Sequence, residues 1–359
     1  MQKITRTTTS SSSTLKDGVS TQTTHVETTT TFKPIPATKT QESPLGSSVK
    51  ETKQPAVSSV PASKNKTPMK FTDANFPLGE DGRTYHVGTK LGETANKIIT
   101  VGDPARAELI AKHLDADVVP IKVQSKRGYL TITGAYKGTR VSIVAIGMGM
   151  SMMDFFVREV RAVVEGPMDI IRFGSCGSIS DHIKVGTMAV ASEGSISVTR
   201  NFDFFTGADA TEPYLISQRV EADADLSASL VQKLNEFVGS GKVSTGLNVT
   251  ADSFYCSQAR KDVRFPDANS DLLASVHARY PSAVTLEMES FMLLHLAKCS
   301  GRTAPGNGAT VEPELSIRAA ATTMIFADRL GGAFITPEQV EELEVSAGKA
   351  CLEALVSTA

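Results

Sequence analysis

The sequence predicts an α/β fold, because short apolar runs suited to buried strands are followed by segments with helical spacing. Residues 98–101 (IITV) precede a helix start signal at Asp103 and Pro104, and residues 284–286 precede the apolar helical pattern SFMLLHLAK. A third apolar run opens residues 169–179 (DIIRFGSCGSI). Strands that alternate with helices are typical of a sheet covered by helices.

Composition excludes several classes of partner. The 359 residues carry a formal net charge of −2, which gives no electrostatic reason to expect a nucleic acid or an anionic membrane. No apolar run approaches the length of a membrane-spanning helix. Cys176, Cys256, Cys299 and Cys351 are scattered without a CxxC pair, so neither a metal site nor a disulfide framework is expected and a reducing, cytoplasmic location fits.

Residues 1–70 differ in composition from the rest of the chain. Thr/Ser tracts such as TRTTTSSSST and recurring prolines dominate this part, and Phe32 is its only aromatic residue. Such a segment buries too little apolar surface to offset its ordering entropy, so we expect a disordered extension. Arginine is scarce and no apolar stripe is present, which disfavours a transit peptide. Residues 71–359 are expected to form a single catalytic domain.

The strand at residues 98–101 leads into a candidate anion site. Asp103 is a good N-cap, Pro104 suits the first helical position, and Arg106 lies on the first turn. Free backbone donors and a guanidinium converge there, as an anion requires. A well-capped surface helix with a solvated arginine explains the same residues equally well.

Residues 169–179 contain a second candidate anion site. The interpretation places Arg172 at a strand end and residues 174–178 (GSCGS) in a loop of small residues, whose N–H groups approach an oxyanion at the carboxyl end of a strand. The alternative is an ordinary Gly/Ser turn with a solvated Arg172.

Between the two candidate anion sites, residues 129–146 alternate like a hairpin that turns at residues 136–138 (YKG). A helix is expected after the GMGM run, whose glycines are too loosely spaced for a dinucleotide fingerprint.

Two later segments concentrate polar side chains. In FYCSQAR, Gln258 and Arg260 suit the edge of a planar heterocycle, because an amide donates and accepts while a guanidinium supplies a fork of donors; a plain polar loop is the alternative. In LEMES, Glu287 and Glu289 lie where a strand gives way to a helix. Buried carboxylates need partners, and the vicinal hydroxyls of a sugar are suitable ones. A helix-capping role explains Glu289 but not both carboxylates.

Four motifs in order, GDPAR, IIRFGSCG, FYCSQAR and LEMES, resemble the nucleoside phosphorylase family, and the spacing of Gln258 and Arg260 is similar to its uridine phosphorylase branch. The resemblance covers roughly residue 82 to the C-terminus. It implies the nucleoside phosphorylase/hydrolase fold, a central mixed, twisted β-sheet that forms a partly closed barrel flanked by helices. The Thr-rich extension suggests a form from a eukaryotic microbe, with a trypanosomatid as one candidate source.

The resemblance implies three groups of site residues. Phosphate would be held by Gly102, Arg106, Arg127, Arg172 and Ser175, with Arg127 supplied by a neighbouring subunit. Ribose would be held by His86, Ser175, Met288 and Glu289, with His86 also from the neighbour, at the 5′-hydroxyl. The base would be held by Phe254, Gln258, Arg260 and Arg329. Arg172, Arg260 and Glu289 would act on the reacting groups, and no metal would take part.

The implied activity is reversible phosphorolysis of uridine to uracil and ribose 1-phosphate, a step of pyrimidine salvage, with inorganic phosphate as co-substrate and no cofactor. A homo-oligomer, a dimer at minimum, would share its sites between subunits. A purine nucleoside phosphorylase, a hydrolytic nucleosidase and a non-catalytic nucleoside-binding protein are the alternatives, and use of deoxyuridine or thymidine stays open.

Three positions depart from the family pattern. Asp328 precedes Arg329 where purine-specific relatives carry a proton-donating aspartate, so a one-residue shift would change the interpretation. Gly128 stands where bacterial members have an acidic residue beside a dimer-interface cation, which leaves that ion open. Residues 302–314 resemble an insertion that would alter oligomer packing or cover the site.

Overall fold

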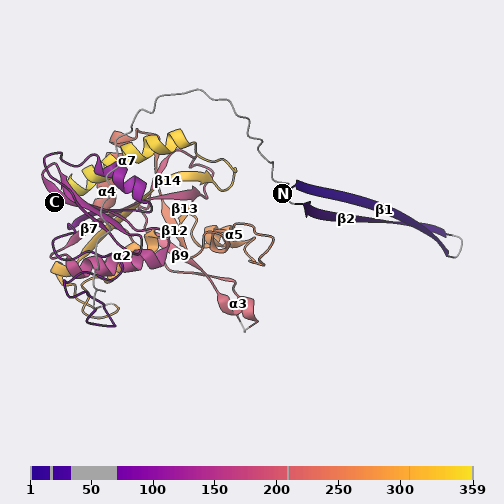
Figure 1. Cartoon of the computed structure of the whole chain (residues 1–359), viewed down its shortest axis with the longest axis horizontal. Coiled ribbons are helices and arrows are strands. Elements are labelled where there is room, and N and C mark those ends of the chain that lie inside the picture. The colour runs from indigo at the N-terminus through magenta and orange to yellow at the C-terminus, as the bar shows by residue number, and fades with distance from the viewer. Residues whose placement is uncertain (1, 17–18, 34–70, 208–209, 307, 358–359) are drawn as a thin grey trace, which may run out of the picture. The chain divides into compact units, whose positions relative to one another are not determined.

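The structure is a computed structural model that describes residues 2–16, 19–33, 71–207, 210–306 and 308–357 (Figure 1). The chain divides into two compact units, Met1–Lys64 and Asn65–Ala359. In the first unit, β1 (Gln2–Lys16) and β2 (Val19–Lys33) pair antiparallel along their length. An isolated two-stranded ribbon is marginally stable in water, so the disorder expected for residues 1–70 stays a prediction. Residues 34–70 of that segment lie outside the described residues.

The second unit alternates strands and helices, as the sequence predicts. Its strands are β3 (Lys97–Val101), β4 (Ile121–Gln124), β5 (Leu130–Tyr136), β6 (Thr139–Ala145), β7 (Met168–Ser178), β8 (Met188–Val190), β9 (Ser195–Arg200), β10 (Tyr214–Ile216), β11 (Val243–Thr245), β12 (Leu247–Ala251), β13 (Ala283–Glu287) and β14 (Ile317–Asp328). Its α-helices are α1 (Pro104–Ala111), α2 (Met150–Val163), α3 (Phe202–Thr206), α4 (Ala224–Phe237), α5 (Leu272–Arg279), α6 (Ser290–Cys299) and α7 (Pro337–Ser357). The segments Cys256–Gln258 and Pro313–Leu315 are short 3-10 helices.

A mixed sheet is built around β7. Its main path runs β10-β9-β12-β13-β7-β3-β6-β5-β4, and β14, β8 and β11 branch from it. Strand β7 pairs with β3 and β14 in parallel and with β13 antiparallel. Within the described residues no pairing joins the edge strands β10 and β4. The mixed α/β sheet flanked by helices is therefore confirmed, but the sheet stays open in place of the partly closed barrel expected.

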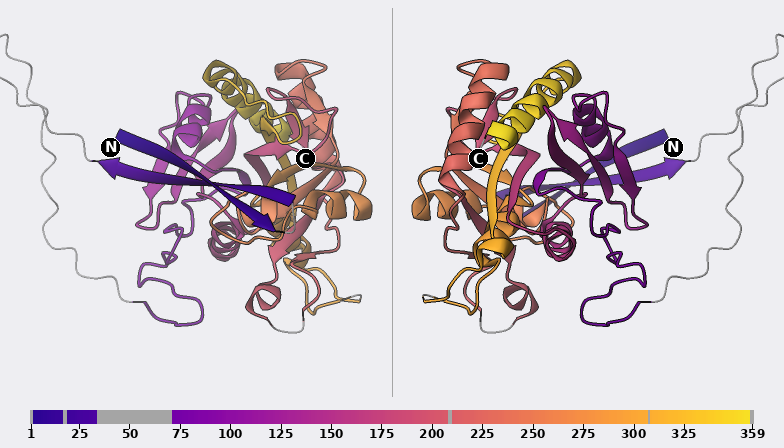
Figure 2. Two further views of the ribbon diagram at one scale, coloured as in Figure 1. Left: turned by 90° about the vertical axis from the view of Figure 1, so that its right-hand side faces the viewer. Right: turned by 90° about the vertical axis from the view of Figure 1, so that its left-hand side faces the viewer.

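Two helical layers cover the sheet, one on each face. Successive side chains of a strand point to opposite faces, so a strand of consecutive apolar residues needs a covering layer on both sides. Ile99 and Ile171 pack in one core with α1, α4 and α7, whereas their neighbours Ile98 and Ile170 pack in a second core with α2 and α6. Figure 2 shows α4 and α7 side by side on their face of the sheet, and these two helices are in contact. The side chains of β3 and β7 thus pack into both cores. This explains why their sequences are continuous apolar runs, which are typical of buried strands.

Local signals in the sequence explain several element boundaries. The Asp103 side chain accepts a hydrogen bond from the Ala105 N–H at 2.7 Å and Pro104 opens α1, so the predicted cap is confirmed. The predicted hairpin is β5 and β6, and Lys137 lies in its turn with a φ of 51°. The predicted loop at residues 174–178 is wrong, because β7 continues through Ser178 with β14 paired alongside. Arg172 is therefore in mid-strand, where the pairing with β3 ends at Thr100.

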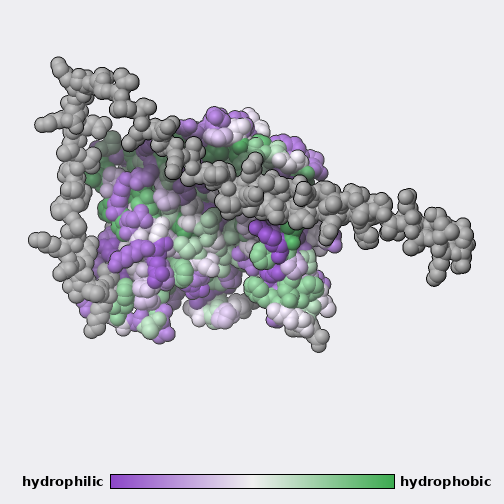
Figure 3. All heavy atoms as spheres, turned by 45° about the vertical axis from the view of Figure 1, so that its right-hand side comes forward, coloured by the Kyte–Doolittle hydropathy of each residue, from purple (hydrophilic) through white to green (hydrophobic). Residues whose placement is uncertain are grey.

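The surface of the second unit carries polar and apolar residues interspersed on the face shown in Figure 3. Among the described residues, none of the helices combines the length and the hydrophobicity needed to cross a bilayer. The four cysteines are all free thiols, and Cys176, Cys256 and Cys351 are buried.

Candidate active site

A cavity of about 430 Å³ opens at the carboxyl ends of β3, β6, β7, β12, β13 and β14. This edge is where ligands bind in open α/β sheets. Segments far apart in the sequence meet there because β3 and β14 run parallel to β7, while the antiparallel β13 brings its own carboxyl end beside residues 175–177 of β7. Most of the predicted site residues line the cavity: Gly102, Arg106, Arg172, Ser175, Phe254, Gln258, Arg260, Met288 and Glu289. His86, Arg127 and Arg329 do not line it.

At one end of the cavity, Arg172 presents unused donors. Its side chain is buried, and Nη2 donates to Glu289 Oε2 at 2.8 Å. Its Nε and Nη1 are buried without a hydrogen-bond partner among the described residues. Buried donors without an acceptor cost about 1–3 kcal/mol each, so an acceptor that enters the cavity here is favoured. A tetrahedral oxyanion such as phosphate matches a guanidinium fork.

Arg106 lies at the same end and is also buried. Burial lowers the pKa of Arg106, and the nearby charge of Arg172 acts in the same direction, while the Glu344 carboxylate opposes both. Glu344 belongs to α7 and accepts from Arg106 Nε at 2.8 Å. Two guanidinium groups, each paired with one carboxylate, are thus brought together at this end of the cavity.

The two glutamates of LEMES have different surroundings. Glu287 accepts hydrogen bonds from Asn248 Nδ2 at 2.8 Å, from Thr250 Oγ1 at 2.5 Å and from the backbone N–H and hydroxyl of Ser290, both at 3.0 Å. Burial and the neighbouring Glu289 raise the pKa of Glu287 against these hydrogen bonds. The capping role, which the sequence alternative gave to Glu289, therefore falls to Glu287, because its donors include the backbone N–H groups of Glu289 and Ser290 at the start of α6.

Glu289 is the carboxylate with polar partners on the cavity side. Its Oε2 accepts from Arg172, and its Oε1 accepts from the Gly149 N–H at 2.5 Å. Gly149 precedes α2, so α2, α6 and β7 all meet at this side chain. A carboxylate fixed by two donors beside a cavity is suited to accept hydrogen bonds from sugar hydroxyls.

Residues of FYCSQAR form another part of the cavity wall. Gln258 is buried, and the Arg260 guanidinium lies 3.9 Å from the centre of the Phe254 ring. Between Gln258 and Arg260, Ala259 adopts a φ of 53°, in the left-handed region, which directs both flanking side chains toward the cavity. Asn269 holds this turn by donating to the carbonyls of Cys256 at 3.0 Å and Arg260 at 2.9 Å.

Arg329 lies just outside the cavity, behind Arg260. Burial and the charge of Arg260 lower the pKa of Arg329, and its Nη1 is buried without a hydrogen-bond partner in the described parts of the chain. The glycine at position 177 makes room for it, since a Cβ there would lie 2.8 Å from Arg329 Cγ. The glycines of residues 174–178 thus allow close approach of side chains to a strand, whereas the sequence interpretation placed them in a loop whose N–H groups approach an oxyanion.

His86 and Arg127 lie together on the surface and meet at Tyr85. Arg127 Nη2 donates to the Tyr85 hydroxyl at 2.9 Å, and the His86 and Tyr85 rings are 4.8 Å apart, edge to face. Glu159 on α2 accepts from the His86 backbone N–H at 3.0 Å, and its Oε1 lies 2.6 Å from His86 Nδ1. Neither residue lines the cavity of its own chain, so the role implied for them by the resemblance is not fulfilled within one chain.

Sequence reasoning missed several residues around the cavity. Glu344 contacts Arg106 from 238 positions further along the chain, and Phe326 and Phe334 also line the cavity. These residues occur in ordinary helix and strand contexts, so no local signal marks them. Within the described residues, no three His, Cys, Asp or Glu side chains gather as metal ligands would.

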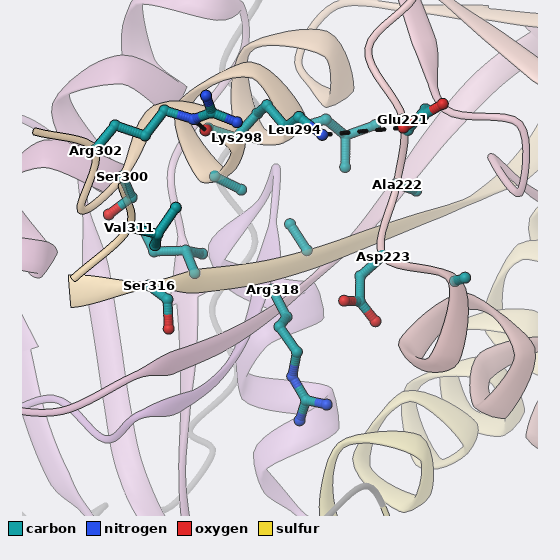
Figure 4. Close-up of a pocket in the computed structure, with 14 residues that line it drawn as sticks. Glu221, Ala222, Asp223, Leu294, Lys298, Ser300, Arg302, Val311, Ser316 and Arg318 are labelled. Atoms are coloured by element: carbon teal, nitrogen blue, oxygen red, sulfur yellow. Dashed lines mark hydrogen bonds and ion pairs between the residues drawn. The ribbon is translucent and has the colours of Figure 1, made fainter. Parts of the chain in front are cut away.

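A second hollow, of about 390 Å³, lies between α6, the start of α4 and residues of the 302–314 segment (Figure 4). Its charges are paired with protein groups: Lys298 with Glu221 at 4.0 Å, and Arg302 Nε with the Lys298 carbonyl at 2.6 Å. Asp223 caps α4 through the Leu226 N–H at 2.9 Å. The proposed insertion thus borders this hollow and does not line the cavity of the site.

Comparisons with known proteins agree with this geometry. Residues 96–305 match the family model described as Phosphorylase superfamily. The chain is 28% identical over 238 residues to a uridine phosphorylase of Thermococcus kodakarensis, covering 66% of this chain and 79% of that protein. It is 32% identical over 223 residues to a purine nucleoside phosphorylase DeoD-type of a Geobacillus species, covering 62% and 83%.

Solved structures share the fold. A chain from a study of two diverse uridine phosphorylases in the oomycete Phytophthora capsici superposes with a TM-score of 0.73 at 38% identity, covering 81% of this chain and 100% of that one. A Trypanosoma brucei nucleoside phosphorylase with uridine phosphorylase activity superposes with a TM-score of 0.63 at 21% identity, covering 79% and 100%, and this likeness shows the fold alone.

Proposed function

This chain belongs to the phosphorylase superfamily, and we propose from this that it catalyses the reversible phosphorolysis of uridine to uracil and ribose 1-phosphate. The observation that carries the proposal is the pair of unsatisfied, buried donors Nε and Nη1 of Arg172, set in the same cavity as Gln258 and Arg260. One end of the cavity suits an oxyanion and the other a heterocycle with carbonyls and an N–H.

Phosphate would bind between Arg106 and Arg172, near Gly102 and Ser175. There it would be held in line with C1′ of the ribose, which turns a bimolecular encounter into a positioned attack. Glu289 would accept hydrogen bonds from the ribose hydroxyls, with Met288 beside it. As the C–N glycosidic bond breaks, a C–O bond forms between C1′ and a phosphate oxygen, and the bonding pair leaves with the base.

The departing uracil carries negative charge until it takes up a proton. Gln258 and Arg260 would stabilise that charge, with Phe254 packed on the ring and Arg329 adding positive charge from behind. Removal of one such electrostatic group typically costs about 3 to 4 kcal/mol of transition-state stabilisation. No side-chain nucleophile and no cofactor are required for this displacement.

The proposed assembly is a homo-oligomer with shared sites. His86 and Arg127 lie together at the surface around Tyr85, away from the cavity of their own chain. They would complete the ribose and phosphate ends of the site in a second copy, so a dimer is the minimum functional unit. Four free thiols favour a reducing compartment, and we place the enzyme in cytoplasmic pyrimidine salvage, which cell fractionation tests.

The experiment that tests the proposal is release of free base from uridine, inosine and thymidine, each with and without inorganic phosphate. We expect release from uridine only when phosphate is present. Release from inosine would favour the purine nucleoside phosphorylase alternative. Release without phosphate would mean a hydrolase, and no release from any nucleoside would favour a nucleoside-binding protein.

A further inference from the structure

Asp328 ends β14, the strand whose last residues line the base end of the cavity. The chain reverses immediately afterwards. The Asp328 N–H donates to the Ala333 carbonyl at 2.9 Å, and the Gly332 N–H donates to the Asp328 carbonyl at 2.8 Å. Ala327 and Phe334 form an antiparallel bridge across the turn. Residues 328–333 therefore form a tight turn that connects two residues of the cavity wall, Ala327 and Phe334.

The Asp328 side chain fixes this turn from inside. Its Oδ1 accepts from the N–H groups of Leu330 at 3.0 Å and Gly331 at 2.8 Å. Gly331 leaves the room that the carboxylate needs, because a Cβ at that position would lie 2.6 Å from Asp328 Oδ2. Oδ2 also lies 4.0 Å from Lys184 Nζ. The described contacts of the carboxylate are thus with the N–H groups of the turn and with Lys184, and it does not line the cavity.

The turn carries two side chains toward the base. The Arg329 N–H donates to the Ser178 carbonyl at 2.9 Å, which attaches the second residue of the turn to the end of β7. Phe334 lines the mouth of the cavity with its ring 6.4 Å from that of Phe326. Phe334 remains 69% exposed, so its position depends on the turn more than on packing.

We propose that Asp328 is a positioning residue for base recognition, which acts by fixing the turn that places Arg329 and Phe334, and that it does not donate a proton to the base. The inference rests on the proposed function for the identity of the base. Hydrogen bonds from the Gly331 and Leu330 N–H groups hold the pKa of Asp328 below its usual range, so the side chain is ionised and has no proton to donate near neutral pH.

The test compares Asp328→Asn, Asp328→Ala and Gly331→Ala. Asn retains an acceptor for the two N–H groups, and Ala removes it. In Gly331→Ala, the added Cβ pushes the carboxylate aside while residue 328 stays an aspartate. We expect Asp328→Asn to keep kcat and both KM values within about threefold of wild type. Asp328→Ala and Gly331→Ala should each raise the KM for uridine by about tenfold, the effect of losing one or two hydrogen-bond anchors, while the KM for phosphate stays unchanged.

Equal loss of turnover in Asp328→Asn and Asp328→Ala would overturn the proposal, since only a proton donor is abolished by both changes. An unchanged KM for uridine in Asp328→Ala would overturn it as well. Amide hydrogen exchange of residues 330–331 gives a readout independent of activity: Asp328→Asn should retain the protection and Asp328→Ala should lose it. If the wild-type enzyme does not consume uridine, the proposed function is wrong. Loss of amide protection at residues 330–331 in Asp328→Asn would, independently of activity, contradict the role of residue 328 as acceptor for these N–H groups.

Discussion

Arg172 and Glu289 form a buried ion pair, Nη2 to Oε2 at 2.8 Å, that joins the centre of β7 to the start of α6. The pair would join the proposed phosphate end of the cavity to its proposed ribose end, because Nε and Nη1 of Arg172 have no hydrogen-bond partner within the described residues and Glu289 is also held by the Gly149 N–H. Each residue thereby orients the other before substrate arrives. Preorganised charges of this kind act without reorganisation cost during the reaction.

Substitution of Glu289 should impair catalysis more than folding. We expect Glu289→Gln to lower kcat/KM by about 10²–10³-fold for uridine and for any other nucleoside that the enzyme accepts, because the ribose is common to all of them. Glu287→Gln is the matched comparison. It places an amide N–H₂ against the donors of Thr250, Asn248 and Ser290, and should lower the free energy of unfolding by about 1–3 kcal/mol.

Steady-state kinetics and urea unfolding of the two variants separate these roles. A loss confined to one nucleoside in Glu289→Gln would contradict a ribose role. Normal stability in Glu287→Gln would contradict the structural role assigned to that carboxylate.

Substitution of Glu344 should weaken phosphate binding selectively. Glu344 holds the Arg106 guanidinium by Nε, and removal of one member of a buried pair leaves the other charge without compensation. We expect Glu344→Gln to raise the KM for phosphate by about tenfold or more, since small displacements of a positioning group are costly, and to leave the KM for uridine unchanged.

Glu342→Gln is the control on the same helix, because Glu342 pairs with Lys242 at the surface at 3.4 Å and exposed pairs contribute little. A lower KM for phosphate in Glu344→Gln would mean that Glu344 competes with phosphate for Arg106, and would contradict the positioning role.

The start of β7 should make the fold sensitive to acid. Burial alone would raise the pKa of Asp169, but hydrogen bonds and charges from Arg318 and Lys97 outweigh it and hold that pKa below its usual range. A carboxylate with a lowered folded-state pKa contributes stability above its unfolded pKa, about 4, and loses it as the pH falls through the folded value.

We therefore expect Asp169→Asn to be less stable than wild type at pH 6, with the difference shrinking below about pH 4. Urea unfolding between pH 3 and pH 6 measures the difference. A gap that is independent of pH would show that the charge of Asp169 is not what stabilises the strand.

Subunit complementation should reveal shared sites. Arg127→Ala and Arg260→Ala are expected to inactivate the enzyme separately, the first from a neighbouring copy and the second within the chain. In a co-expressed mixture, random dimers would restore one site in each heterodimer, about a quarter of the total. The control mixture of Gln258→Ala and Arg260→Ala should regain nothing, because both residues line the cavity of one chain. Equal activity of the two mixtures would contradict a site shared between copies.

Local signals in the sequence predicted much of the site. The Asp103 cap with Arg106 on the first turn, the residues Gln258 and Arg260, and the glutamates of LEMES were identified from residue type and spacing, and the cavity brings them together. Such signals work because strand ends and helix starts have strict chemical requirements, and the carboxyl edge of the sheet then gathers whatever follows each strand.

Contacts distant in sequence account for what local signals missed. The different surroundings of Glu287 and Glu289 depend on Asn248 and Thr250 of β12 and on Arg172 of β7. The strand geometry of residues 174–178 depends on β14, which pairs with them from more than a hundred positions away. Glu344 is recognisable only once α7 has packed beside α1.

Phosphorolysis of uridine is tested most directly by analysing the products of uridine turnover with and without inorganic phosphate. ³¹P NMR monitors the fate of the phosphate. We expect phosphate to be consumed as ribose 1-phosphate and uracil appear in equal amounts, and no uracil to be released when phosphate is absent. Free ribose as the product, or uracil release that does not depend on phosphate, would contradict it.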